Sequence, residues 1–305
     1  GIVFDAWFSE RSMLDNGAIE RTMADLENNN ASYLEDGATW LKSTDYGDDK
    51  DRVLVKSDGE FTYLTPDVAY HRDKFSRADW LINVWGADHH GYIARMKAAM
   101  EALGHDAKQL TVTITQLVKL IRGGEEVRLS KRHGDIIELR EIVEEIGPDA
   151  TRFMYLLQSV DTKQTFDLDL AASKVMDNPV FYVQMAHARI RSIQNKAEAL
   201  GIWPLHSSDA DLSLLEHERE LEILRNLFNF TDIVQLSARE LAPHKIAVWL
   251  RELAISVHGF YHDCYVVGEN VPLELTAARL QLVEAARIGL VSGLDLLGVS
   301  APDSM

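Results

Sequence analysis

Cysteine is almost absent from this sequence: Cys264 is the single one in 305 residues. One cysteine excludes an internal disulfide, and it leaves no set of thiolates from which a zinc site could be built. Because Cys264 lies in an apolar helical pattern, we expect a small buried residue there rather than a reactive thiol.

Positive charge is also scarce. The sequence has 31 Lys and Arg against 48 Asp and Glu, a formal net charge of -17. This balance argues against a broad basic face for nonspecific nucleic-acid binding. A local basic site remains open, because salt screens charges beyond about 8 Å under physiological conditions.

Long apolar runs are missing as well. No stretch approaches the roughly 20 residues that a membrane-spanning helix needs, and no secretory signal pattern is present. We therefore expect a cytoplasmic protein with no membrane partner.

The first part of the chain, residues 1–140, mixes helical and strand patterns. Trp80–Trp85 (WLINVW) is nearly continuously apolar, as in a buried parallel strand, and precedes a predicted helix over 92–103. A β-branched run over 110–118 predicts the next strand, which completes a βαβ unit of a Rossmann-type α/β domain. Two strand-like runs over 52–64, joined at Asp58-Gly59, predict a hairpin.

From residue 139 onward the pattern is helical. We expect a connection over 141–175 and a helical bundle over 176–305, so that helix predominates in the whole chain. Asn178-Pro179 has the form of a helix start, and a break is expected near Asn229.

Residues 125–135 (EEVRLSKRHGD) gather three cations, Arg128, Lys131 and Arg132, around Ser130. Such a loop can give charge-assisted hydrogen bonds to phosphate oxygens. Most charge runs are solvated surface, but this one follows a strand of the predicted α/β domain, where ligands of open sheets bind.

A second loop, Gly86-Ala87-Asp88-His89-His90, follows the WLINVW strand. Gly86 permits a close backbone approach, and Asp88 can accept hydrogen bonds from ribose hydroxyls. Capping of the following helix by Asp88 is the structural alternative. The adjacent Asp and His residues have poor spacing for a tetrahedral metal site, so we expect no protein-bound metal.

Four stretches resemble one family in the same order. Residues 127–134 (VRLSKRHG) resemble the K-M-S-K-S signature of class I aminoacyl-tRNA synthetases, in the form that arginyl-tRNA synthetases use. The stretches WGADHHGYIARM (85–96), EEIGPDATRFMYL (144–156) and NPVFYVQMAHARIRSI (178–193) are similar to the same family. Within them, Asp149–Arg152 (DATR) resembles the D-A-L-R sequence that names its helical anticodon-binding domain.

The resemblance implies a reaction in which arginine and ATP give arginyl-adenylate and pyrophosphate, followed by transfer to the arginine tRNA. ATP would be bound with Mg2+ as its counter-ion. The catalytic loop would be Arg128, Ser130 and Lys131, with Arg128 and Leu129 in place of the first lysine and the methionine. The implied ATP-binding residues are Gly86, Asp88, His90, Val118, Leu129, Ser130 and Lys131.

Tyr63 and Asp67, in TYLTPDVAY, match the family's Tyr and Asp that recognise the arginine side chain. A carboxylate can bind a guanidinium group through two parallel hydrogen bonds, which a lysine cannot imitate. The alternative for Asp67 is a helix N-cap after Pro66.

The bundle is implied to contact tRNA through aromatic and basic side chains. On one helix the candidates are Tyr182, His187, Arg189 and Arg191, and on another they are Trp249, Arg251, Tyr261 and Tyr265. For Trp249 and Tyr261, packing in the bundle core is the favoured alternative.

The second class I signature, H-x-G-H, occurs nowhere in the sequence. Our hypothesis is that the chain is the C-terminal portion of a synthetase, monomeric when whole, and cannot activate arginine alone. The alternative is a non-catalytic tRNA-binding module with a vestigial half of a nucleotide site. A cysteinyl-tRNA synthetase would need zinc-binding cysteines and is not supported.

Overall fold

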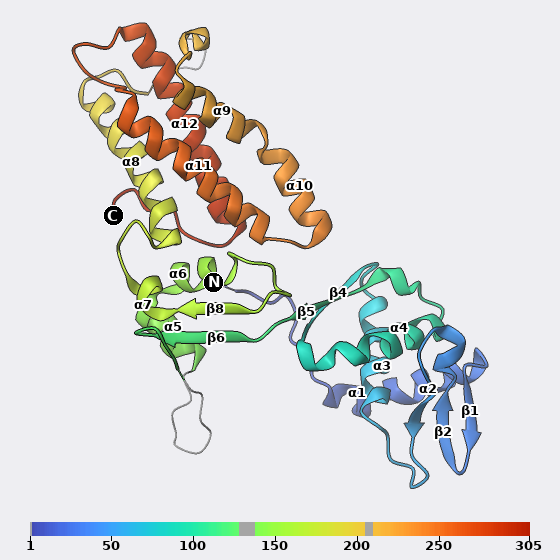
Figure 1. The fold of residues 1–305 in the computed structure, drawn as a ribbon. Helices are drawn as coiled ribbons and strands as arrows, with labels where there is room; N and C mark the ends of the chain where they lie inside the picture. Colours follow the sequence, from blue (N-terminus) through green and yellow to red (C-terminus); the bar gives the residue numbers. More distant parts are fainter. Residues whose placement is uncertain (1, 128–137, 205–209) are drawn as a thin grey trace. The chain divides into compact units, whose positions relative to one another are not determined.

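The computed structural model describes residues 2–127, 138–204 and 210–305 (Figure 1). Its internal contacts divide the chain into two compact units, Gly1–Leu117 and Val118–Met305, named here the N-terminal and C-terminal units. The expected fold class is confirmed, because a small α/β region precedes a helical bundle and helix predominates. The division at 140 and 175 stays a prediction.

The N-terminal unit contains two small sheets and several short helices. Its elements in chain order are α1 Arg11–Asp15, α2 Ala18–Asn28, β1 Ser32–Glu35, β2 Ala38–Leu41, η1 Ser43–Tyr46, β3 Arg52–Val55, α3 Leu64–Phe75, β4 Leu81–Gly86, η2 Ala87–Tyr92, α4 Ile93–Ala102, η3 Ala107–Gln109 and β5 Leu110–Thr115. Strands β4 and β5 pair in parallel from Leu81↔Leu110 to Gly86↔Thr115. The predicted βαβ unit, β4–α4–β5, is therefore confirmed.

Strand β4 is buried on one face only. Leu81 and Asn83 are buried, whereas Ile82 is 46% and Val84 65% exposed. The apolar run predicted burial on both faces, which is wrong for the described residues, because the sheet has two strands and nothing described covers the side of Ile82 and Val84.

The predicted hairpin over 52–64 is only partly present. Its first run forms β3, but the second makes a single bridge, Val55↔Phe61, before α3 begins at Leu64. A hairpin that the sequence analysis overlooked joins β1 to β2 through Asp36-Gly37. Both turn residues have positive φ, 52° and 78°, as a two-residue hairpin turn requires.

The strand predicted over 110–118 is two strands. Strand β5 ends at Thr115, and Val118 begins β6, Val118–Arg122, instead of ending the run. Strand β6 pairs with β7, Glu125–Glu126, through a turn at Gly123-Gly124, and in parallel with β8, Gln164–Asp167. Strand β8 corrects the expectation of unbroken helix after residue 139.

The rest of the C-terminal unit is helical. Its elements are α5 Leu139–Ile146, α6 Pro148–Tyr155, α7 Leu168–Ala172, α8 Pro179–Ala199, η5 Leu212–Leu214, α9 Glu218–Phe228, α10 Phe230–Glu240, α11 His244–Asp263 and α12 Leu273–Leu296. The start of α8 is confirmed, since Asn178 Oδ1 accepts a hydrogen bond from the Val180 N–H at 3.1 Å. The break at Asn229 is confirmed between α9 and α10. Within the described residues, no helix combines the length and the apolar character needed to span a membrane.

Two glycines set how closely α12 approaches its neighbours. A Cβ atom on Gly289 would lie 2.7 Å from Leu227 Cδ2, and one on Gly293 would lie 2.7 Å from Leu250 Cδ2. Trp249 packs beside both positions and is 2% exposed. Packing of the bundle core thus depends on these two glycines of α12 as well as on large apolar residues.

The segment 298–303 lies across α6 and α8. Asp149 on α6 accepts hydrogen bonds from Ser300 N–H at 3.2 Å and from the Ser300 hydroxyl. Gln184 donates to both Asp149 Oδ2 and Ser300 O, each at 2.9 Å. The aspartate of the DATR stretch therefore has a clear structural task, which is to hold this segment against the bundle.

Candidate functional site

The N-terminal end of α3 presents Tyr63 and Asp67 one helical turn apart. Tyr63 occupies the N-cap position and is 92% exposed, while Asp67 lies in the first turn and is partly buried. The N-cap alternative for Asp67 is therefore wrong, because the cap position belongs to Tyr63. Residues at i and i+4 share a helix face, so a phenol and a carboxylate are displayed together.

Asp67 is held by a neighbour from another element. The Tyr92 hydroxyl, at the end of η2, donates to Asp67 Oδ2 at 3.0 Å. Burial raises the pKa of Asp67, and the charge of Glu10 acts in the same direction; the Tyr92 hydrogen bond, Lys74 and His89 lower it. The result is a carboxylate whose charge is only partly compensated by the protein.

A chain of buried and partly buried hydrogen bonds leads to the Asp67 backbone. Lys74 Nζ donates to Asn83 Oδ1 at 3.2 Å, and Asn83 Nδ2 donates to His71 Nε2 at 2.6 Å. His71 Nδ1 in turn lies 2.7 Å from the Asp67 carbonyl oxygen, to which it donates. Burial lowers the pKa of His71 to about 4, with the charge of Lys74 as a further cause. No sequence pattern revealed these hydrogen bonds, because their members come from two elements, α3 and β4.

The loop over 86–90 forms the short helix η2. Gly86 occupies its N-cap position, and no side chain caps it, so Asp88 does not act as the cap. Asp88 and His89 are exposed and form a loose pair at 3.5 Å, and His90 is exposed too. A Cβ on Gly86 would lie 2.7 Å from Asp88 Oδ1, so a larger residue at this position would clash with the Asp88 side chain.

In the sequence, the cationic loop follows β7. Arg128, Leu129, Ser130, Lys131 and Arg132 lie outside the described residues. Val118, at the start of β6, is partly buried in the C-terminal unit. In the portion of the chain that is described, no group of three or more His, Cys, Asp and Glu side chains is arranged to hold a metal ion.

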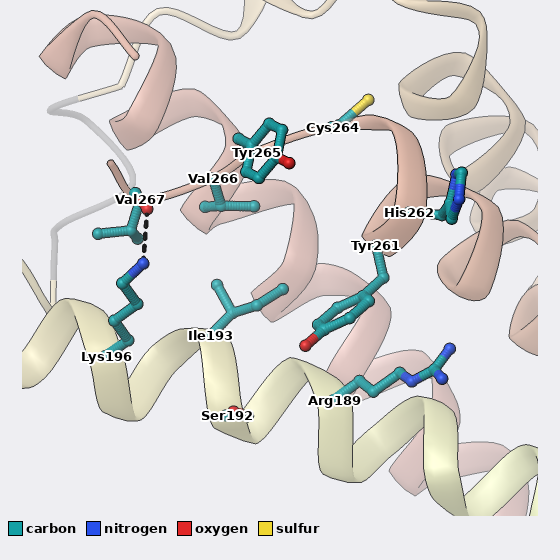
Figure 2. Close-up of a pocket in the computed structure, with 10 residues that line it drawn as sticks. All are labelled: Arg189, Ser192, Ile193, Lys196, Tyr261, His262, Cys264, Tyr265, Val266 and Val267. Atoms are coloured by element: carbon teal, nitrogen blue, oxygen red, sulfur yellow. Dashed lines mark hydrogen bonds between the residues drawn. The ribbon is translucent and has the colours of Figure 1, made fainter. Parts of the chain in front are cut away.

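The helical bundle carries a cleft of about 580 Å³ between α8 and the end of α11 (Figure 2). One wall is the face of α8 formed by i, i+3, i+4 and i+7 positions, and the other is the end of α11 with the residues that follow it. The lining residues are Arg189, Ser192, Ile193, Lys196, Tyr261, His262, Cys264, Tyr265, Val266 and Val267.

Aromatic and basic groups meet in this cleft. The Arg189 guanidinium lies 5.0 Å from the centre of the Tyr261 ring and donates to His258 Nδ1 at 2.8 Å. Lys196 Nζ donates to the Val267 carbonyl at 3.0 Å, the bond drawn in Figure 2. Tyr261 is 45% and Tyr265 79% exposed, so their ring faces can reach a ligand.

Tyr261 is thus not a core residue, contrary to the favoured interpretation. Cys264, in contrast, is buried, as expected. Figure 2 shows its sulfur pointing away from α8, and burial raises the pKa of the thiol. Ser192, Ile193 and Lys196 were not among the predicted site residues, although their helical spacing from Arg189 places them on the same face of α8.

The other candidate tRNA contacts divide by exposure. Trp249 is buried, and its indole N–H donates to Asn226 O at 2.8 Å, so it offers no ring face to RNA. This corrects its place among the candidates and agrees with the core alternative. His187 is also buried. Tyr182 is partly buried edge-on against His258, and Arg191 pairs with Asp303 at 3.0 Å, whereas Arg251 is exposed.

The chain is similar to known proteins in sequence and in fold. Residues 5–194 match the family model described as the catalytic domain of class I tRNA synthetases (R), and residues 183–305 match that of the DALR anticodon binding domain. The arginine–tRNA ligase of Shouchella clausii is 49% identical over 306 residues, and that of Listeria monocytogenes serotype 4b (strain F2365) is 49% identical over 305. The match covers this whole chain but 54% of each relative, so the chain spans about half their length.

Two solved structures add to this. One, described as a putative arginyl-tRNA synthetase from Campylobacter jejuni, superposes with a TM-score of 0.89 at 35% identity, covering 100% of this chain and 65% of that one. The arginyl-tRNA synthetase of Thermus thermophilus gives 0.78 at 23% identity, covering 95% and 58%, which is a likeness of fold.

Proposed function

Since this chain belongs to the class I arginyl-tRNA synthetase family, we propose that it is part of an arginine–tRNA ligase and carries its arginine-recognising carboxylate, Asp67. The observation that supports this most is the pairing of a partly buried Asp67 with an exposed Tyr63 one turn earlier. A guanidinium group can take two parallel hydrogen bonds from such a carboxylate, while the phenol covers its flat face.

The other substrate roles follow from the sequence motifs. Lys131, Ser130 and Arg128 bind the ATP phosphates, where cations stabilise the charge that develops on pyrophosphate. Leu129 and Val118 contribute to the ATP site, and Gly86, Asp88 and His90 serve the adenosine. Mg2+ accompanies ATP as its counter-ion. The cytoplasmic location and the monomeric state of the whole protein remain predictions.

The test of the proposal is Asp67→Asn in the full-length protein that contains this chain. The amide keeps the shape but loses the charge, so KM for arginine rises on the order of 10- to 100-fold in arginine-dependent ATP–pyrophosphate exchange. Asp79→Asn, an exposed aspartate of the same unit, is the matched control. An unchanged KM for arginine in Asp67→Asn would contradict the proposal.

We further propose that the cleft between α8 and α11 receives an unpaired base of the arginine tRNA. Two exposed tyrosine rings and two basic side chains, Arg189 and Lys196, support this proposal. The basic side chains lie in a chain whose formal net charge is -17. Bases of RNA loops are bound by stacking on such rings and by contacts to their edges.

Replacing one ring tests this second proposal. Tyr261→Ala should weaken binding of arginine tRNA about tenfold, because stacking of one base contributes about 1–3 kcal/mol. Phe228→Ala on α9 removes an aromatic ring that is 84% exposed outside the cleft, and should leave affinity unchanged. Equal losses in both variants, measured by filter binding, would argue against the cleft.

A further inference from the structure

Tyr92 is clamped in place by neighbours on both sides. Its ring meets the Trp85 ring edge-on, with centroids 5.9 Å apart and an interplanar angle of 73°. The Arg95 guanidinium lies 4.7 Å from the centre of the Tyr92 ring. These contacts from β4 and α4 hold a phenol that no motif singled out, and they aim its hydroxyl at Asp67 Oδ2.

The direction of the hydrogen bond follows from the electrostatics. Burial and the adjacent Asp67 carboxylate raise the pKa of the Tyr92 hydroxyl, so it stays protonated and donates. Glu10, Lys74 and His89 are the other charged or titratable groups that act on Asp67. Among these neighbours, Tyr92 makes the direct hydrogen bond to the carboxylate.

We propose that Tyr92 is a positioning residue for arginine recognition: by holding Asp67 Oδ2, it fixes the plane of the carboxylate. This inference rests on the proposed role of Asp67. The terminal torsion of an aspartate is broad, so an unheld carboxylate can turn out of the orientation that a two-point contact with guanidinium needs. With Oδ2 held, Oδ1 and the second lone pair of Oδ2 remain for the substrate.

The experiment is Tyr92→Phe in the full-length protein, assayed by arginine-dependent ATP–pyrophosphate exchange. KM for arginine should rise about tenfold, because a hydrogen bond to a charged group is lost. Both kcat and KM for ATP should stay within about twofold, since the chemistry at the phosphates is untouched. The acid limb of kcat/KM for arginine should move to higher pH, because Asp67 loses a donor that favours its charged form.

Tyr46→Phe is the matched control, since it removes a hydroxyl from the same unit, where Tyr46 packs against the core. The control should leave every parameter unchanged. If Asp67→Asn raises KM for arginine but Tyr92→Phe changes neither that KM nor the pH profile, the positioning role is wrong and the proposed function stands. If Asp67→Asn leaves KM unchanged, the proposed function fails and this inference fails with it.

Discussion

His71 occupies a place in which only its neutral imidazole satisfies both partners. Its Nδ1 donates to the Asp67 carbonyl, so its Nε2 must accept from Asn83. A second proton on Nε2 would face the Asn83 amide group, which already points a donor at it. Burial opposes the charged form further, and with Lys74 it lowers the pKa to about 4.

This arrangement predicts a pH dependence of stability. The folded pKa of His71 lies below its ordinary value of 6.5, so the unfolded chain binds more protons between the two values. The contribution is complete above pH 6.5 and falls as the pH drops toward 4, by on the order of 3 kcal/mol in the free energy of unfolding.

Urea unfolding at pH 7.0, 5.5 and 4.5 measures the effect. The carboxylates of the chain add their own pH dependence, so the informative quantity is the difference between the parent and His71→Gln. The variant should lose less stability on acidification than the parent does. Parallel pH profiles for the two proteins would contradict the assigned protonation state.

Single residues of the site were only partly predictable from the sequence. Tyr63 and Asp67 came from one stretch of nine residues, and the structure places both at the start of α3. No motif predicted a role for Tyr92, Asn83 and Lys74, because their roles depend on contacts between α3, β4 and η2. Trp249 was a candidate for stacking because it is aromatic, but the favoured alternative was core packing, and Trp249 is indeed buried.

At the scale of elements, long helices with caps were predictable and short strands were not. Helix α8 begins at its Asn178-Pro179 signal, because the cap acts within four residues. Strand β8 has four residues, and its pairing partner β6 lies more than 40 positions earlier. The strand expected over 110–118 gave no sign of its break, since an apolar pattern does not reveal where pairing changes partner.

Helices α6 and α8 give a prediction about the segment 298–303. Asp149→Ala removes the acceptor for Ser300 and leaves Gln184 with one partner fewer, which should cost about 1–3 kcal/mol. Amide hydrogen exchange should increase in residues 298–303 and in the first turns of α8. Asp161→Ala, at an exposed turn, is the control. Unchanged exchange in the segment would show that Asp149 does not hold it.

For the whole molecule, we predict that the 305-residue chain binds tRNA but does not activate arginine. The reason is that no H-x-G-H sequence is present and that β4 and β5 form a two-stranded parallel sheet with an exposed apolar face. Purified chain should show no arginine-dependent ATP–pyrophosphate exchange, while arginine tRNA should bind in preference to a noncognate tRNA.

The salt dependence of tRNA affinity is a further test of the cleft. If Arg189 and Lys196 each meet one phosphate, affinity for arginine tRNA should fall about tenfold between 50 and 200 mM salt. Measurable exchange activity would refute the inactivity of the chain alone. Equal binding of cognate and noncognate tRNA would place selectivity outside the bundle.

The glycines of α12 have a consequence for how related sequences can diverge. An alanine at Gly289 or Gly293 would need room that Leu227 and Leu250 now fill. A lineage that gains such a methyl group must shrink the facing leucine in compensation, or separate the helices. We therefore expect substitutions at Gly289 and Leu227, and at Gly293 and Leu250, to occur together in evolution.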